Sequence, residues 1–454
     1  MTDHVPAAHL AEIVSILRDG DEEARLDAVR QLSKEPADPA ERKAALAVLI
    51  DVMGDDDWQV RKEAVASVLC WTDLPLLSEA LVEAMGEPDN VGRRNAVIEA
   101  VMRLGTVCID PLLRHLHMKP EHRKVLVDVL GTFGDPRVIP ALGETLKDED
   151  PNVRIASMEQ LASFTGEEVL PVLRDALKST DTLVVLAALD GLNRQRDQLS
   201  VAELQPLLSE VTLRPALMTA LGHTQDAAAI PALIEGLIEK ARGAREAALV
   251  GLYRLYQSLP AIGRQQIVDA IRKLDENTVR SMTRALMEAT PPVREATAAL
   301  LGWLGKLELV RPLVLVLGDG DSSVADTASQ ALIDLDAGDA ALRILADILP
   351  SVDPRSRGNV CRFFVRHAAL VQARASAALH DRLGTVLVST LTDKNAQSAS
   401  AAAQALGVLG DTGHRARLQQ LASGGGQAGT LANDVLRKLD AREADAPVGS
   451  GQAS

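Results

Sequence analysis

One stretch of the chain, residues 134–154, reads GDPRVIPALGETLKDEDPNVR. Asp150 stands directly before the run PNVR, where its carboxylate can accept hydrogen bonds from the free amides of a first helical turn. Pro140 follows a Gly-Asp-Pro turn, at a place where the first turn of another helix tolerates its missing amide. The stretch therefore predicts one helix after the turn at Gly134 and a second helix that begins at Asp150.

Related stretches recur along the sequence. Aligned on the residue four after the Asp-like position, they fall at 25, 61, 93, 123, 154, 185, 214, 245, 294, 325, 357 and, less clearly, 397. Most steps are close to 31 residues, which is room for two helices of about 12 residues and two short turns. The step of 49 residues between 245 and 294 leaves space for one extra helix, which we place near 278–289.

The composition favours helices packed on helices. Aromatic residues are only 2% of the chain, and most of its 47% hydrophobic residues are Ala, Leu and Val, which suit closely packed helices better than sheets. One helix pair cannot bury its apolar face alone, so neighbouring pairs must stack. We predict an all-α fold, a right-handed α-solenoid of stacked antiparallel helix pairs, continuous over residues 1–440. Residues 441–454 are small and polar, and we expect a disordered tail there.

The repeated pattern is Asp-x-x-Val-Arg-x-x-Ala, followed by Gly-Asp-x-x-x-Ile-Pro-x-Leu-x-x-x-Leu-x-Asp. It resembles a HEAT repeat of the short type found in phycobilisome-lyase-like proteins, and the resemblance covers roughly Leu10 to Leu439. Solenoids with this motif include scaffolds, adaptor proteins, bilin lyases, a metal-dependent hydroxylase and a few DNA-binding enzymes. The resemblance therefore implies the fold and leaves the function to particular residues.

The net charge and the cysteines limit which partners and which cellular compartment are expected. The chain has 48 basic and 63 acidic residues and a net charge of −15, so its field repels nucleic acid and anionic membranes. Its start, Met1 to Glu12, lacks the pattern of a signal peptide. Three scattered cysteines, Cys70, Cys108 and Cys361, are interpreted as buried small hydrophobes in a reducing compartment. We expect a cytoplasmic protein.

The second helix of each repeat, helix B, carries acids at one recurring position. This position lies midway between the two core leucines, about 200° around the helix from the core layer. In solenoids that this sequence resembles, helix B lines the concave surface. The acids are Asp51, Glu83, Glu144, Asp175, Glu235, Asp269 and Asp347. Two interpretations stay open: a ladder of carboxylates that binds a basic protein surface, or solvated charge on an exposed helix face.

Two of the departures from the ladder are informative. Arg114, His115 and His117 place a basic, titratable cluster where the neighbouring repeats are acidic. Leu315 and Val316 place apolar side chains there, which predicts an exposed anchor for a partner. The alternative is that the extra helix just before this repeat covers them.

Six arginines follow the capping position at the same spacing in their repeats. Their recurrence beside a capping Asp predicts salt bridges between adjacent repeats, each of them weak on its own. They are Arg25, Arg61, Arg93, Arg154, Arg245 and Arg294.

Sequence signatures of catalysis are absent. The nine His never form His-Glu or His-x-x-x-His, the cysteines form no Cys-x-x-Cys, and there is no phosphate loop or nucleophile elbow. We therefore expect no catalytic residue, metal, cofactor or small-molecule substrate. The sequence favours a non-enzymatic scaffold or adaptor that binds a basic protein surface in a concave acidic groove. The alternative is a modifying protein of the bilin-lyase or deoxyhypusine-hydroxylase-like repeat group.

Overall fold

The computed structural model describes residues 7–86, 90–118, 120–336, 338–410 and 413–445. Within these ranges all regular structure is helical and no strand occurs, so the predicted all-α solenoid of stacked antiparallel helix pairs is confirmed. The chain divides into two compact units, residues 1–197 and residues 198–454. Each unit is described by itself below.

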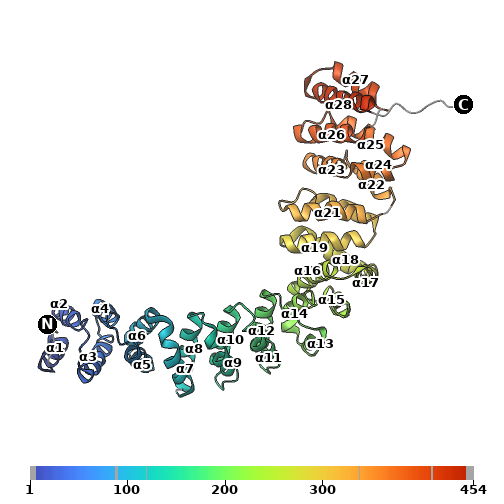
Figure 1. The fold of residues 1–454 in the computed structure, drawn as a ribbon. Helices are drawn as coiled ribbons and strands as arrows, with labels where there is room; N and C mark the ends of the chain where they lie inside the picture. Colours follow the sequence, from blue (N-terminus) through green and yellow to red (C-terminus); the bar gives the residue numbers. More distant parts are fainter. Residues whose placement is uncertain (1–6, 87–89, 119, 337, 411–412, 446–454) are drawn as a thin grey trace. The chain divides into compact units, whose positions relative to one another are not determined.

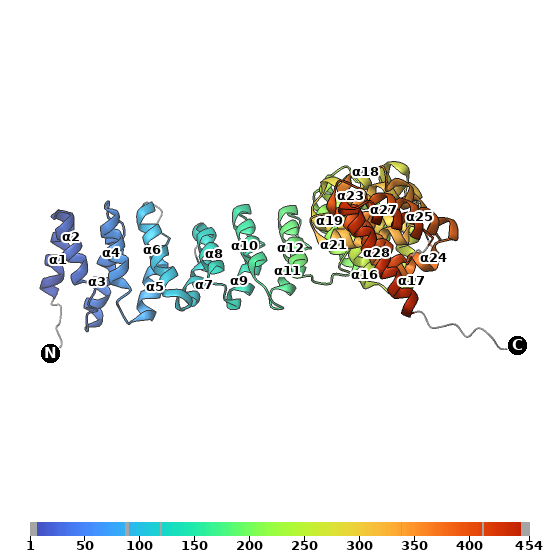
Figure 2. The same cartoon turned by 90° about the horizontal axis from the view of Figure 1, so that it is seen from above.

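The first unit consists of two layers of helices, seen in Figures 1 and 2. The A layer contains α2 (Glu22–Gln31), α4 (Trp58–Val68), α6 (Val91–Leu104), α8 (Arg123–Thr132), α10 (Pro151–Ser163) and α12 (Thr182–Arg194). The B layer contains α1 (Ala7–Asp19), α3 (Pro39–Val52), α5 (Leu74–Ala84), α7 (Ile109–Met118), α9 (Ile139–Thr145) and α11 (Leu170–Ala176). Each B helix packs on the A helix that follows it in the chain.

All A helices of the first unit except α8 begin after a capping side chain. Asp57 accepts a hydrogen bond from the amide of Gln59 at 2.6 Å, and Asp150 accepts one from the amide of Asn152 at 2.8 Å. Such caps satisfy amides that have no partner inside the helix. Gly134, with a φ of +63°, makes the turn between α8 and α9, a conformation that glycine adopts without strain.

The second unit repeats the same scheme with additions. Its A helices are α14 (Arg214–Leu221), α16 (Arg242–Ser258), α19 (Pro291–Trp303), α21 (Ser322–Asp334), α23 (Pro354–Arg366), α26 (Ala396–Leu409) and α28 (Gly426–Asp445). Its other helices are α13 (Val201–Leu204), α15 (Ile230–Gly236), α17 (Ala261–Ile271), α18 (Glu276–Glu288), α20 (Val310–Val316), α22 (Ala340–Ile348), α24 (Ala368–Arg374), α25 (Ala377–Thr390) and α27 (Arg415–Ser423).

Two helices account for the long steps of the repeat. Helix α18 occupies the place where we expected an extra helix near 278–289, and it packs on α19 and α20. Helix α24 lies between α23 and α25, inside the step of 40 residues between 357 and 397. Several B helices are only 7 residues long, shorter than expected. In α9 and α15 the chain enters through a short 3₁₀ turn, Pro136–Val138 and Ala227–Ala229 respectively.

The end of the chain differs in part from the expected tail. Helix α28 continues to Asp445, so the predicted disorder over 441–454 is wrong for its first five residues, and 446–454 lie outside the described residues. A single continuous solenoid over 1–440 stays a prediction. In the parts of the chain that the structure describes, no helix is both long and apolar enough to cross a lipid bilayer.

An arginine seam joins successive repeats, as the sequence predicts for Arg25, Arg154 and Arg294. We use this name for five arginines near the start of A helices. Each of them pairs with an Asp in the loop that precedes the next A helix. The pairs are Arg25–Asp55, Arg123–Asp148, Arg154–Asp181, Arg294–Asp319 and Arg357–Asp393. Arg154 also donates to the carbonyl of Asp148 at 3.0 Å, in the loop before its own helix. Each guanidinium therefore ties the backbone just before its own helix to the loop before the next A helix.

Candidate interaction surface

The seven predicted ladder acids share one place in their helices. Six of them are the second-to-last residue of a B-layer helix, and Asp269 is the third from the end of α17. All seven are exposed, and the side chains of Asp51 and Glu144 are 83% and 70% accessible. The ladder is therefore a surface feature of the B helices and is not part of the core. Its position on a concave face stays a prediction.

The helix ends do not favour these carboxylates. The last turn of an α-helix carries a partial negative charge, so an acid there is mildly destabilising, whereas a cation would be stabilising by about 0.3–1 kcal/mol. Neither packing nor the helix dipole accounts for acids in the last turn of seven helices. The recurrence is therefore compatible with a role in solubility or in binding.

Local bases neutralise part of the ladder. The ammonium groups of Lys178 and Lys147 lie 3.1 and 3.9 Å from the carboxylate of Asp175. Asp347 pairs with Arg382 at 3.1 Å, and Asp51 lies 3.8 Å from Arg93. Exposed pairs of this kind are individually weak, about 0–1 kcal/mol.

Two ladder acids are more open. Glu83 and Glu235 make no ion pair or hydrogen bond through their carboxylates with any residue in the described ranges. These two positions hold the ladder's least compensated charge.

A groove of about 600 Å³ separates α9 from α11 and contains two ladder acids. Pro140, Pro171 and Val172 form its apolar part, and Glu144 and Asp175 stand along it. Both prolines lie in the first turn of their helices, as the sequence predicts for Pro140. The groove can take an aliphatic stem with a cationic head, since long basic side chains combine these two properties.

The predicted basic cluster does not form as one group. Arg114 pairs with Glu79 of α5, and Nε2 of His115 lies 3.7 Å from the same carboxylate. His115 is buried, because its side of α7 packs on α5, so its prediction as part of an exposed cluster is wrong. His117 is exposed and faces Glu144 of the ladder, with Nδ1 4.0 Å from the carboxylate.

The predicted apolar anchor is reduced to one residue. Leu315 is 54% exposed, so the extra helix α18 does not cover it. Val316 is 4% exposed and cannot belong to an exposed anchor. It takes the position that buried Thr145 occupies in its own repeat, which faces the core of the helix stack.

Other exposed and buried groups fall outside the predicted site. Trp58 is 59% exposed at the start of α4, with the ammonium of Lys62 5.9 Å from the ring centre. Cys70 is exposed, so its interpretation as a buried hydrophobe is wrong. Burial raises the pKa of the Cys108 thiol to about 11 and that of Cys361 to about 12, which leaves both in the unreactive thiol form.

Among the residues that the structure describes, no three His, Cys, Asp or Glu side chains come together in a way that could hold a metal ion. Tyr256 stacks on Trp303 with 3.9 Å between ring centres, and the indole is buried.

Comparison with known families identifies the repeats. Residues 10–102 and 109–193 match the family of HEAT repeats, so the resemblance to HEAT repeats seen in the sequence is confirmed over these residues. No curated protein sequence matches the chain.

The solved structures that match the chain share little sequence with it. Kap121p bound to Nup53p is 15% identical, with 91% of this chain and 51% of that chain covered and a TM-score of 0.47. The CpcE and CpcF complex of phycocyanin lyase from Nostoc is 18% identical, with 54% and 94% covered and a TM-score of 0.32. An engineered protein is 18% identical, with 94% and 98% covered and a TM-score of 0.32. The chain spans about half the length of the Kap121p chain that it matches.

Proposed function

We propose that this protein is a non-enzymatic scaffold or adaptor of the cytosol, and that its ladder of carboxylates binds a basic surface of another protein. The observation that carries the proposal is the recurrence of exposed acids at the same end of seven helices. A regular row of like charges is a poor arrangement for stability, because neighbouring carboxylates repel one another. It suits a partner that brings cations at a matching spacing.

The spacing of the ladder supports a partner with several basic residues. Packed helices lie about 8–10 Å apart, which is close to the Debye length of about 8 Å at physiological ionic strength. Adjacent carboxylates within one unit therefore act together on an approaching cation. Such a field mainly raises the association rate and selects against acidic partners, so we expect binding to weaken as salt rises.

The groove between α9 and α11 would add specificity within the first unit. Its apolar residues Pro140 and Val172 can contact an aliphatic stem while Glu144 receives the charged end. Asp175 is already compensated by Lys147 and Lys178. Basic side chains of the partner are therefore expected to engage Glu83, Glu144 and Glu235 more strongly than Asp175.

Charge reversal on the ladder tests the proposal. The partner is first identified by affinity capture from the native host with the full chain as bait, followed by mass spectrometry. The variant Glu144→Lys, Asp175→Lys, Glu235→Lys should then lose capture of that partner, because cations now meet cations. Its helical circular dichroism should be unchanged, since all three side chains are exposed.

A matched control separates position from net charge. Glu159, Glu210 and Asp334 are exposed acids outside the ladder, and their reversal to Lys changes the total charge by the same amount. This control should retain the partner. Equal capture by both triple variants, or stoichiometric pigment, iron or zinc in the purified protein, would contradict the scaffold proposal.

A further inference from the structure

Arg61 donates only to backbone carbonyls in the described ranges, so its predicted salt bridge is wrong. Arg245 is the second member of the predicted arginine set that lacks its acid. Its guanidinium reaches back to the carbonyls of Glu239 and Lys240, at 2.6 and 2.7 Å, as seam arginines reach to their preceding loops. However, it makes no ion pair with any described residue, whereas Arg294 pairs with Asp319 at 2.7 Å. The predicted salt bridge of Arg245 is therefore wrong.

The inserted helix explains the missing partner. Asp319 lies two residues before the residue that caps α21, and Glu288 stands at the same place before Thr290, which precedes α19. Glu288 is the last residue of α18 instead of a loop residue. Its carboxylate makes no ion pair with the described part of the chain, and only its backbone carbonyl accepts a hydrogen bond, from Arg242 at 3.4 Å.

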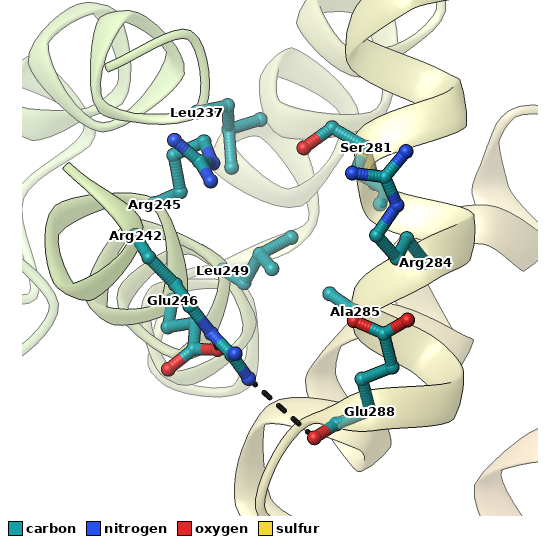
Figure 3. Close-up of a pocket in the computed structure, with 10 residues that line it drawn as sticks. Leu237, Arg242, Arg245, Glu246, Leu249, Ser281, Arg284, Ala285 and Glu288 are labelled. Atoms are coloured by element: carbon teal, nitrogen blue, oxygen red, sulfur yellow. Dashed lines mark hydrogen bonds and ion pairs between the residues drawn. The ribbon is translucent and has the colours of Figure 1, made fainter. Parts of the chain in front are cut away.

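A cavity of about 180 Å³ lies between α16 and α18, beside Arg245. Figure 3 shows Arg245 and Arg284 on opposite sides of this space, with the hydroxyl of Ser281 directed into it. Arg284 has no hydrogen-bond or ion-pair partner in the described ranges. Arg242 lines the same cavity and pairs with Glu246 at 2.7 Å. Two guanidinium groups thus face one small space without a carboxylate bound to either.

We propose that this cavity is a binding site for a small phosphate group, either inorganic phosphate or a phosphate monoester. Guanidinium groups present planar pairs of donors that match phosphate oxygens, and Arg245 and Arg284 offer them from two helices. The hydroxyl of Ser281 supplies a further donor. A phosphate here replaces the carboxylate that other repeats provide, and it connects α16 to the inserted helix. The proposal does not depend on the ladder or its partner.

Glu288 is the internal competitor of the ligand. Its side chain also lines the cavity, and it repels an entering anion. Glu288→Gln should therefore bind phosphate more tightly than the natural chain, by a few-fold.

Calorimetric titration of the full chain with inorganic phosphate, at constant ionic strength, tests the site. We expect binding by the natural chain and an affinity at least about tenfold lower for Arg284→Gln, because a charged hydrogen-bonding partner is removed. Arg245→Gln should lose affinity similarly. Since that residue also holds the preceding loop, Arg284→Gln is the variant on which the test depends.

The control is Arg280→Gln, on the same helix. Arg280 is 75% exposed, pairs at 3.8 Å with Glu276 and does not line the cavity, so its loss should leave phosphate affinity unchanged. A natural chain that does not bind millimolar phosphate would overturn the proposal. An equal loss in Arg280→Gln would do the same, since it would indicate nonspecific attraction. Acetate that binds as tightly as phosphate would overturn the assignment of the phosphate group.

Discussion

The carboxylate of Asp319 shows what a seam pair contributes. Arg294 donates to its two oxygens at 2.8 and 2.7 Å, and both side chains are largely buried. The hydrogen bonds from Arg294 lower the pKa of Asp319 below its ordinary value of 3.8. Because the folded pKa lies below the unfolded one, the pair stabilises the fold above about pH 4, and this stabilisation is lost as the pH falls through the lowered pKa.

Replacement of this carboxylate should reproduce that dependence. We expect Asp319→Asn to lower the free energy of unfolding by about 1.5–3 kcal/mol at pH 7, the range for hydrogen bonds to charged groups. The difference from the natural chain should shrink at pH 3, because Asp319 of the unfolded natural chain is then largely protonated and the lowered pKa of the folded state no longer stabilises fully. Urea unfolding at both pH values measures it, and Asp334→Asn, at an exposed site, is the control. A difference of the same size at pH 3 would argue against the assignment.

At the residue scale, the periodicity of the sequence predicted the exposure of some side chains correctly and of others wrongly. The ladder acids and Leu315 are exposed as expected, because a two-residue offset from the core leucines turns them away from the stack. Val316 is buried because it faces the core of the helix stack, and His115 is buried because its side of α7 packs on α5, which a single-helix pattern does not show. Arg245 has the seam spacing, and only the arrangement of α18 reveals that its acid is missing.

At the element scale, Gly302 allows the backbones of α19 and α21 to approach closely. A Cβ added to Gly302 would lie 2.7 Å from Cα of Ala331 and 3.0 Å from its carbonyl oxygen. Backbone atoms cannot move aside as a flexible side chain can, so we expect Gly302→Ala to destabilise the protein by about 1–3 kcal/mol. Chemical unfolding measures the effect.

The matched control for this substitution is Gly243→Ala in α16. Only Pro215 Cγ, at 3.9 Å, would lie near the added methyl group. The change should be neutral or stabilising by up to about 1 kcal/mol, because Ala has the higher helix propensity. If both substitutions shift the unfolding midpoint equally, the helix crossing is not limited by contact at Gly302.

Helix starts were the most predictable elements. The caps at Asp57, Asp150 and Asp321 work through a side chain and its own following amides, so a short stretch of sequence is sufficient. The 49-residue spacing between positions 245 and 294 likewise predicted the place of α18. Helix α24 was not expected, since its sequence AALVQAR continues the apolar composition of its neighbours without a capping residue.

At the scale of the whole molecule, contacts run between neighbouring helix pairs, so stability should fall toward the chain ends. Of the described side chains of α1, only Ile13 is buried, whereas α3 buries five residues. Helix α28 buries Gly429, Ala432, Val435 and Leu439, whereas α26 buries nine residues. Terminal helices of a stack have a neighbour on one side only and open more readily.

Hydrogen exchange followed by mass spectrometry tests this gradient. We expect amides of α1 to exchange faster than those of α3 and α4, and amides of α28 faster than those of α23 and α26. The measured exchange rate of each peptide is divided by its intrinsic rate, so differences in amino-acid composition between peptides do not affect the comparison. Uniform protection from α1 to α4 would indicate that each unit opens only as a whole.

The arginine seam also affects how a repeat can be added to the chain by duplication. Consecutive arginines meet at one loop: Arg123 binds the carboxylate of Asp148, and Arg154 binds its carbonyl. An in-frame tandem copy of residues 151–181 would bring its own arginine and its own terminal aspartate, and every junction, old and new, would be complete. Unequal recombination between such segments would thus yield a folded, longer protein in one genetic event, without compensating substitutions.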